Sequence, residues 1–421
     1  MVLRRKSWLP VRTCRLRFDS SDGATRQVAD GVQEMKKTRI LTPGPVMVPE
    51  DVLLEMARPM DHHRTAWFRD LIRQCHELLQ YLFQTKSQVL TITGSGTSAA
   101  EAAIVGCCPP GHKALVIING KFAERWGKVC QAFHIDHTEL ALEWGHGAKA
   151  HHVINEMDAD PKIDTVICVH SETSAAAVSD IEAIGKITRE RGAILIVDGI
   201  TSVGVIPARM DDWGVDAYIT GSQKALMLPP GLGFVAVSER AWERIDSGTT
   251  QTLYNDLKAY RKSLENWDVP YTPAVTLVRG LLKSLQGFKK RGLENIWAEA
   301  STMARATRAA AEAMGLGVFA KDPVDSVTAM IVPDGVDEAA LRKTMRATHG
   351  FQIAGGQAHL KGKIIRLSHM GYLDSFDILG AISALELTLV GQGCAIEPGV
   401  GLAAAQAVFR DAQTSPAATT G

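Results

Sequence analysis

The sequence predicts an α/β fold with a large, mostly parallel, doubly wound sheet and a smaller α/β layer after it. Between residues 88 and 237, short apolar runs alternate with helical stretches, a pattern typical of parallel strands buried on both faces. Crossover helices would join such strands into an open sheet with one antiparallel member. The expected strands are 88–93, 114–119, 165–170, 193–198, 217–220 and 234–237.

The pattern changes after a long helical stretch at 275–314. Strand, helix, strand, strand and helix follow at 326–332, 337–348, 351–354, 363–368 and 375–390. We therefore expect a large domain at 38–294, with an N-terminal arm and a helix at 68–83, and a small domain at 295–396. Residues 397–421 are rich in alanine and end in small polar residues, so we expect a frayed tail there.

The first 37 residues differ from the rest of the chain. Basic residues dominate before the first acid, Asp19, and no helical or strand periodicity develops through Asp30. We expect this basic leader to be disordered or to precede the true start, because Met35 opens a segment that resembles a natural beginning. An organelle transit peptide is the alternative interpretation.

Composition and charge exclude several classes of protein. The chain carries 46 basic and 46 acidic residues, so its formal net charge of zero indicates neither a nucleic-acid nor a membrane partner. Its seven cysteines are scattered without a CxxC pair, which favours a reducing compartment. No apolar run approaches the roughly 20 residues that a membrane helix needs. We expect a soluble, cytoplasmic protein.

The chemistry is concentrated in two segments, 194–198 and 218–226. Lys224 lies in a polar turn after an apolar strand, where a lysine can be held desolvated and aimed, as a Schiff-base lysine requires. Asp198 ends the preceding buried strand. The spacing of 224 − 198 = 26 positions matches one strand-turn-helix-strand excursion, so both side chains can reach the same edge of a parallel sheet. The alternative is an ordinary solvated lysine in a loop.

The segment Gly221-Ser222-Gln223-Lys224-Ala225-Leu226, with further segments in the same order, resembles the class V, fold-type-I pyridoxal-phosphate-dependent aminotransferases. The resemblance is to the alanine/serine–glyoxylate (serine–pyruvate) group and extends from about Thr42 to about Gly393. It implies pyridoxal 5'-phosphate as cofactor, with Lys224 holding the aldehyde carbon and Asp198 facing the pyridine nitrogen. It also implies a seven-stranded sheet in the large domain and a homodimer with active sites at the interface.

A Gly-rich turn lies in the segment 93–102. It follows a strand and opens a helix, so free backbone N–H groups and the helix dipole favour an anion there. The turn resembles the phosphate-binding turn of the family, which implies that Ser95, Gly96 and Thr97 contact the cofactor. The same stretch is also a G-x-G-x-x-A fingerprint, but no acid ends the next strand, so a nicotinamide cofactor is disfavoured. A turn without a ligand is the third interpretation.

Further cofactor contacts follow from the resemblance. Phe122 occupies the position of an aromatic ring that stacks on the pyridine ring, although a core phenylalanine is the simpler interpretation. The segment 170–174 is similar to a family segment in which the residue at the position of Thr173 binds the phenolic oxygen. Gln223 matches a glutamine that reaches the phosphate. Thr272 matches a threonine that touches the phosphate in the other subunit.

Substrate binding is assigned to Arg366 and Gly44. Arg366 lies inside an apolar strand, where a buried charge needs an anionic partner. The resemblance implies that its planar fork binds the substrate α-carboxylate, with an internal ion pair as the alternative. Gly44 belongs to an extended, proline-rich arm at 42–49. The sequence reveals no second cation that would indicate a dicarboxylate substrate.

These roles imply transamination between a small amino acid, alanine or serine, and a 2-oxo acid, glyoxylate or pyruvate. Lys224 would move the Cα proton, and Asp198 would keep the ring nitrogen protonated. The alternatives are a cofactor-binding subunit or scaffold without catalysis, an aspartate aminotransferase, and a desulfurase-type lyase. Gln223 disfavours the lyase, because the desulfurases of this class carry a histidine at that position.

Overall fold

The computed structural model describes residues 37–249 and 251–414. The contacts within the chain divide it into two units, Met1–Lys37 and Thr38–Gly421. Only the second unit is described below. The basic leader that the sequence predicts lies, apart from Lys37, outside the described residues. Within the described part, no helix is both long enough and apolar enough to cross a membrane.

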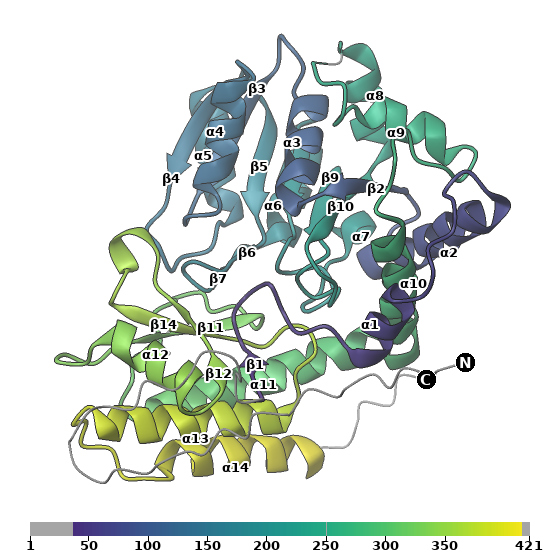
Figure 1. The fold of residues 1–421 in the computed structure, drawn as a ribbon. Helices are drawn as coiled ribbons and strands as arrows, with labels where there is room; N and C mark the ends of the chain where they lie inside the picture. The colour runs from purple at the N-terminus through teal and green to yellow at the C-terminus, as the bar shows by residue number, and fades with distance from the viewer. Residues whose placement is uncertain (1–36, 250, 415–421) are drawn as a thin grey trace, which may run out of the picture. The chain divides into compact units, whose positions relative to one another are not determined.

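A seven-stranded sheet forms the centre of the large domain (Figure 1). Its strand order is β2-β10-β9-β8-β5-β3-β4, in which β10 is antiparallel to both β2 and β9 and the other neighbours are parallel. The predicted mostly parallel sheet with an antiparallel member is therefore confirmed. The strands are β2 (Gln88–Gly94), β3 (Lys113–Ile118), β4 (Asp136–Ala141), β5 (Ile163–Val169), β8 (Ile194–Asp198), β9 (Ala217–Gly221) and β10 (Gly231–Val237).

Burial explains why the apolar runs form the middle of this sheet. Every residue of β8 and β9 is buried, as parallel strands covered on both faces require. Strand β4 lies at the edge of the sheet, and its polar sequence was not among the predicted runs because none of its residues is buried. The surrounding helices are α1 (Glu50–Met56), α2 (Ala66–Phe83), α3 (Gly96–Cys107), α4 (Glu124–Ala132), α5 (Ala150–Ala159), α6 (Ile181–Glu190), α7 (Met210–Trp213), α8 (Glu239–Ser247), α9 (Leu257–Leu264) and α10 (Val275–Arg291).

The predicted helical stretch at 275–314 is divided into two helices. Gly292 has a φ of 81° and separates α10 from α11 (Leu293–Ala313), because a residue with positive φ cannot continue a right-handed helix. Helix α11 leads into the small domain, where buried residues form a second hydrophobic cluster.

A three-stranded antiparallel sheet with the order β11-β14-β13 forms the small domain. Its remaining parts include a short parallel pair between the arm and β12. The elements are β11 (Val327–Ile331), α12 (Glu338–Ala347), β12 (Phe351–Gln352), β13 (Ala354–Gly355), the 3-10 turn Ala358–Leu360, β14 (Ile364–Ser368), α13 (Ser375–Gly391) and the arm strand β1 (Arg39–Ile40).

The sequence predicts a frayed tail at 397–421, and this prediction is wrong for those of its residues that form a helix in the described part. Val400–Thr414 form helix α14, which packs along α11 and α13 (Figure 1). Ala405 is fully buried, and the Gly401 N–H donates to the buried Glu386 carboxylate at 2.6 Å. Small residues allow the close approach of α14, so alanine and glycine here reflect helix packing rather than fraying. Residues 415–421 lie outside the described part.

Candidate active site

A pocket opens where the carboxyl ends of β2, β3, β5, β8 and β9 meet. In an open α/β sheet this edge is the usual position for a ligand. Most of the residues that the sequence predicts as cofactor contacts line this one pocket, although they come from five separate segments. They are Ser95, Gly96, Thr97, Phe122, Thr173, Asp198, Gln223 and Lys224.

Lys224 lies in the turn that follows β9, and the N-terminal arm holds its side chain. Its Nζ donates to the carbonyl oxygen of Pro43 at 2.6 Å. Gly44 packs so closely on this side chain that an added Cβ would overlap it, and Gly44 has a φ of 99°. Burial lowers the pKa of the Lys224 amine to about 8, although Asp198 acts in the opposite direction. The amine is therefore more easily deprotonated than that of an exposed lysine.

Asp198 ends β8 and lies fully inside the pocket wall. Its Oδ1 accepts from the Ile200 N–H at 2.9 Å, and its Oδ2 accepts from Trp126 Nε1 at 3.1 Å. Burial raises the pKa of its carboxyl to about 6, and the nearby Glu172 raises it further, whereas Lys224 lowers it. Two hydrogen-bond donors thus fix the orientation of a carboxylate that is shielded from solvent.

The turn between β2 and α3 brings a helix N-terminus to the same pocket. Ser95 is the N-cap residue but makes no side-chain capping bond. A Cβ added to Gly96 would lie 2.7 Å from Ile200, so close packing also explains this glycine. The side-chain oxygen Oε1 of Gln223 is buried without a hydrogen-bond partner among the described residues. A buried orphan acceptor beside a helix N-terminus indicates room for a polar ligand.

Glu172 is a buried acid to which the sequence analysis gave no role. Its Oε2 accepts from the Phe122 and Ala123 N–H groups at 3.0 Å each, and its Oε1 accepts from the Ser174 N–H at 2.9 Å and from the Ser174 hydroxyl at 2.6 Å. Burial raises the pKa of this carboxyl, and the four donors oppose the increase. Glu172 therefore joins the turn that carries Phe122 to the segment that carries Thr173.

Arg366 lies on β14 in the small domain and is only 4% exposed. It enters none of the ion pairs that the described residues form, so the internal salt bridge considered above is not found. Its Nε donates to the Gly355 carbonyl at 2.9 Å and its Nη1 to the Thr173 carbonyl at 2.7 Å. Burial lowers the pKa of the guanidinium to about 10, and Glu172 raises it. A buried cation whose hydrogen bonds go to neutral carbonyls, with only a nearby acid and no ion pair, favours an anionic ligand.

Thr272 is the predicted residue that this chain does not bring to the pocket. It is exposed, and its role was implied for the other subunit of a dimer. The neighbouring Tyr271 donates to the Leu253 carbonyl at 2.6 Å and stacks on Tyr254. The position of Thr272 in a single chain therefore leaves its implied contact as a prediction.

Sequence reasoning also missed Trp126 and Arg125, which line the pocket. Trp126 binds Asp198, and Arg125 donates from Nη1 to the Thr97 hydroxyl at 2.8 Å. Both lie on the first turns of α4, directly after the Phe122 turn. The available signal was their position just beyond the carboxyl end of an expected strand. Arg125 is thus a cation of the pocket that the sequence analysis did not name.

Comparison with known proteins identifies the family. Residues 52–374 match the family model described as aminotransferase class-V. The chain belongs to the class V aminotransferases. Membership of this family implies pyridoxal phosphate as the cofactor.

Among curated relatives of this class V aminotransferase, a soluble hydrogenase small subunit from Synechococcus is 38% identical over 382 residues, covering 89% of this chain and 99% of the relative. A serine–glyoxylate aminotransferase from Methylorubrum extorquens is 34% identical over 388 residues, covering 89% of this chain and 96% of the relative. A solved pyridoxamine–pyruvate aminotransferase from Mesorhizobium loti has a TM-score of 0.85 and 28% identity, covering 90% of this chain and 99% of that structure. The predicted fold-type-I architecture, with its smaller C-terminal domain, is confirmed.

The pocket fits the cofactor of a class V aminotransferase. A lysine with a lowered pKa, an acid held by two donors and a helix N-terminus line it together. The buried Oε1 of Gln223 in the same pocket still needs a donor or an ordered water. These features are suited to an aldehyde, a pyridine nitrogen and a phosphate, respectively, so the donor set is consistent with pyridoxal phosphate.

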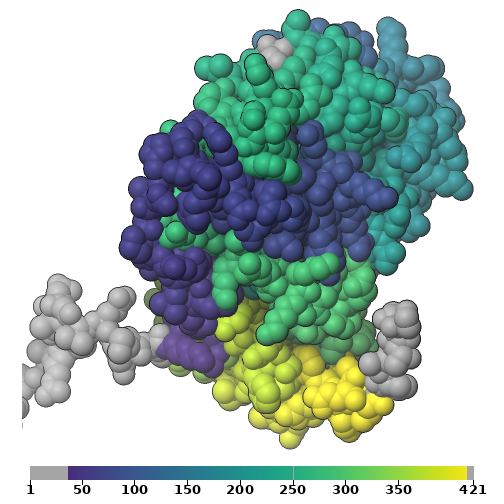
Figure 2. Space-filling model, turned by 90° about the vertical axis from the view of Figure 1, so that its right-hand side faces the viewer, coloured from purple at the N-terminus to yellow at the C-terminus, as the bar shows by residue number. Residues whose placement is uncertain are grey.

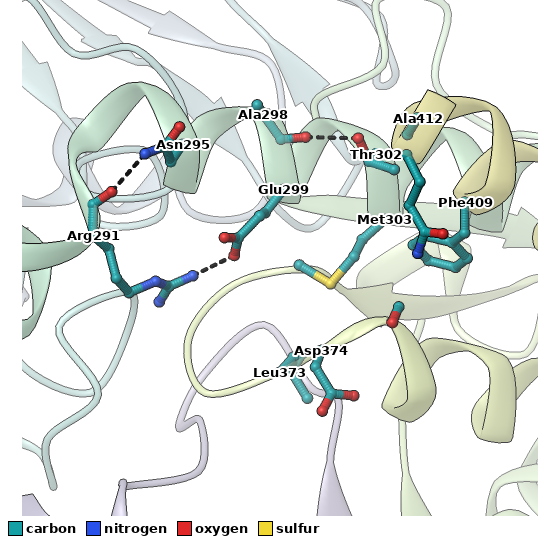
Figure 3. Close-up of a pocket in the computed structure, with 12 residues that line it drawn as sticks. Arg291, Asn295, Ala298, Glu299, Thr302, Met303, Leu373, Asp374, Phe409 and Ala412 are labelled. Carbon is teal, nitrogen blue, oxygen red and sulfur yellow. Dashed lines mark hydrogen bonds and ion pairs between the residues drawn. The ribbon is translucent and has the colours of Figure 1, made fainter. Parts of the chain in front are cut away.

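A second pocket of the class V aminotransferase is larger, about 620 Å³ against about 120 Å³, but its chemistry is different (Figure 3). It lies among α11, α14 and the start of α13. Arg291 pairs with Glu299 there, Asn295 donates to the Arg291 carbonyl at the end of α10 at 2.7 Å, and Thr302 donates to the Ala298 carbonyl of its own helix at 2.8 Å. Its polar groups are thus satisfied by one another, and size alone does not make it the active site.

Proposed function

We propose that this class V aminotransferase transfers an amino group between alanine or serine and glyoxylate or pyruvate. The observation that carries the proposal is Arg366, a buried cation that forms no ion pair in the described part of the chain. Its hydrogen bond to the carbonyl of Thr173, a residue that lines the cofactor pocket, supports this role. A guanidinium in this position is suited to an α-carboxylate, which both an amino acid and a 2-oxo acid carry.

The remaining residues have roles that follow from their contacts. Pyridoxal phosphate, when bound, would supply a ring that accepts the electrons of the broken Cα–H bond. Lys224 would hold the cofactor in the resting enzyme and, once displaced by the substrate, move the Cα proton, because its lowered pKa leaves much of the amine neutral near pH 8. Asp198, oriented by Trp126 and Ile200, would bind the protonated ring nitrogen.

We also propose a homodimer. Large apolar side chains are exposed at Leu54 (71%), Met60 (72%) and Leu253 (81%), all in segments near α1, α2 and α9. Figure 2 shows the N-terminal segments, in purple and dark blue, bordered by green segments on one face of the molecule. A second copy that covered these side chains would remove their apolar surface from water. A second copy would bring a Thr272 to the pocket, as the resemblance implies.

A panel of substrates tests the proposed reaction. L-serine and L-aspartate are each paired with glyoxylate, pyruvate and 2-oxoglutarate, and L-alanine with glyoxylate and 2-oxoglutarate, because alanine and pyruvate would only regenerate each other; kcat/KM is measured for every pair. Alanine with glyoxylate, or serine with glyoxylate or pyruvate, should give the highest values. A clear preference for aspartate or 2-oxoglutarate would contradict the substrate assignment while leaving the reaction class intact.

The name of the Synechococcus relative supports a second candidate, a subunit of a larger complex that has no transaminase activity of its own. The panel separates the two functions. No turnover with any pair, by a protein that has bound its cofactor, would favour the subunit. The presence of Lys224 and Asp198 in one pocket, with Arg366 bonded to the pocket residue Thr173, supports the enzyme.

A further inference from the structure

Arg125 is a charged residue of the pocket to which the proposed function gives no role. It is the second residue of α4, and its Nη1 donates to the Thr97 hydroxyl at 2.8 Å. Its guanidinium carbon lies 5.6 Å from the centre of the Phe122 ring. Arg125 therefore spans from the ring-stacking residue to the second residue of α3, where the helix N-terminus lines the pocket.

Arg125 forms no ion pair in the described part of the chain, although the carboxyl of Asp198 in the same pocket is near enough for Arg125 to lower its pKa. None of the ion pairs formed within 37–249 and 251–414 includes Arg125, whereas its neighbours Lys121 and Glu124 pair with each other. The hydroxyl of Thr97 is a neutral partner, and the α3 N-terminus beside it carries the positive end of a helix dipole. The unpartnered Oε1 of Gln223 marks a third polar group in the same pocket. Two positive groups at one position favour an anion between them.

We propose that Arg125 binds the phosphate of the cofactor together with the α3 N-terminus. Family membership identifies the phosphate ester as pyridoxal phosphate. The inference rests on that identity and adds to the proposed function a positively charged side chain that binds the phosphate. Arg366 does not compete for this role, because it binds Thr173 and Gly355 rather than the α3 turn. The alternative role for Arg125 is to bind the second carboxylate of a dicarboxylate substrate.

Binding of two forms of the cofactor separates these roles. The full chain is stripped of cofactor, and the Kd values of pyridoxal phosphate and of pyridoxal, which lacks the phosphate, are measured by absorbance titration. Arg125→Gln should weaken binding of pyridoxal phosphate by about tenfold and binding of pyridoxal by less than about twofold, as expected for loss of one charge-assisted bond at an exposed site. Arg125→Lys should restore part of the loss, because an ammonium keeps the charge without the fork.

Lys128→Gln is the matched control, since Lys128 is an exposed cation one turn further along α4 and outside the pocket lining. It should leave both Kd values unchanged. In 1 M salt the effect of Arg125→Gln should shrink, because an exposed charge is screened. An equal loss for pyridoxal phosphate and pyridoxal, or no loss for either, would overturn the inference.

Kinetics provide the second arm of the test. If Arg125→Gln leaves the ratio of the two Kd values unchanged and raises KM for aspartate but not for alanine, Arg125 is a substrate residue and the inference is wrong. If the wild type fails to transaminate but still prefers pyridoxal phosphate through Arg125, the inference stands and the proposed function fails.

Discussion

Arg366 donates a 2.7 Å hydrogen bond from Nη1 to the carbonyl oxygen of Thr173. This bond links β14 of the small domain to the segment after β5 that lines the cofactor pocket. The proposed substrate cation is thus positioned by the cofactor-binding domain and not only by its own strand.

Replacement of Arg366 tests the substrate assignment. Arg366→Ala should lower kcat/KM for every amino donor by about two to four decades, because it removes two charge-assisted hydrogen bonds, about 3–5 kcal/mol, from a desolvated pocket. Arg366→Lys should recover only part of the activity. The cofactor absorbance and the dimer should barely change. Unaltered donor kinetics with an unfolded small domain would show that Arg366 is structural.

Lys224→Ala should bind cofactor but lose transamination by several orders of magnitude, since the nucleophile and the base disappear together. In the wild type, borohydride should fix the cofactor to Lys224. Peptide mapping checks this expectation. Reduced cofactor on a different lysine would refute the assignment.

The lowered pKa of Lys224 predicts an unusual pH profile for attachment of the cofactor. Only the neutral amine attacks an aldehyde, so the rate should rise about tenfold between pH 7 and pH 9 and then level off, given a pKa of about 8. An ordinary lysine would continue to gain about tenfold per unit to above pH 10. Asp198→Asn should move the midpoint to lower pH, because Asp198 raises the pKa of Lys224. Stopped-flow absorbance measures the rate.

Asp198 should reduce the stability of the cofactor-free chain at neutral pH. Its folded-state pKa of about 6 lies above the ordinary value of 3.8, so the native state holds its proton more tightly and stability falls as pH rises from 3.8 through 6. Asp198→Asn should therefore raise the free energy of unfolding above pH 6 by up to about 2–3 kcal/mol, less the loss of one hydrogen bond, and a higher unfolding temperature would reveal it. The gain should vanish near pH 4. Transamination should decrease at the proton-transfer step, and an unchanged single-turnover rate would reduce Asp198 to a strand-end acid.

Glu172→Gln should be strongly destabilising. The carboxylate now accepts hydrogen bonds from four donors, and the NH₂ group of the new amide would face two of these donors without being able to accept from them. We expect a loss of about 2–4 kcal/mol and a shifted cofactor absorbance, since the Phe122 turn loses its anchor. Glu124→Gln is the control, because it breaks only a partly exposed pair with Lys121 and should cost less than about 1 kcal/mol. Equal effects of the two substitutions would argue against a special role for Glu172.

Local sequence was sufficient where a single segment determines its own structure. The buried strands β8 and β9 are continuous apolar runs, and Asp198 and Lys224 follow from their ends. Strand β4 was missed because edge strands can be polar. Helix α14 was missed because alanine and glycine give no amphipathic signal, although they permit close packing.

The missed site residues share a different cause. Glu172, Trp126 and Arg125 act through hydrogen bonds to Phe122, Asp198 and Thr97, each in another segment. No spacing rule encodes such contacts, because the sheet order rather than the sequence brings the segments together. The role of Thr272 needs a second subunit and stays a prediction.

The arm has a consequence for how the protein is made. Arg39 and Ile40 pair with Phe351 and Gln352, while Pro43 receives the hydrogen bond from Lys224. A ribosome releases the N-terminal segment first, and its strand partners emerge only near the end of synthesis. The arm therefore lacks its strand partner until most of the small domain has been translated, so a chain terminated before residue 351 would keep the arm on the lysine turn only through local contacts, such as the Val46 N–H to the Gln223 carbonyl at 3.2 Å.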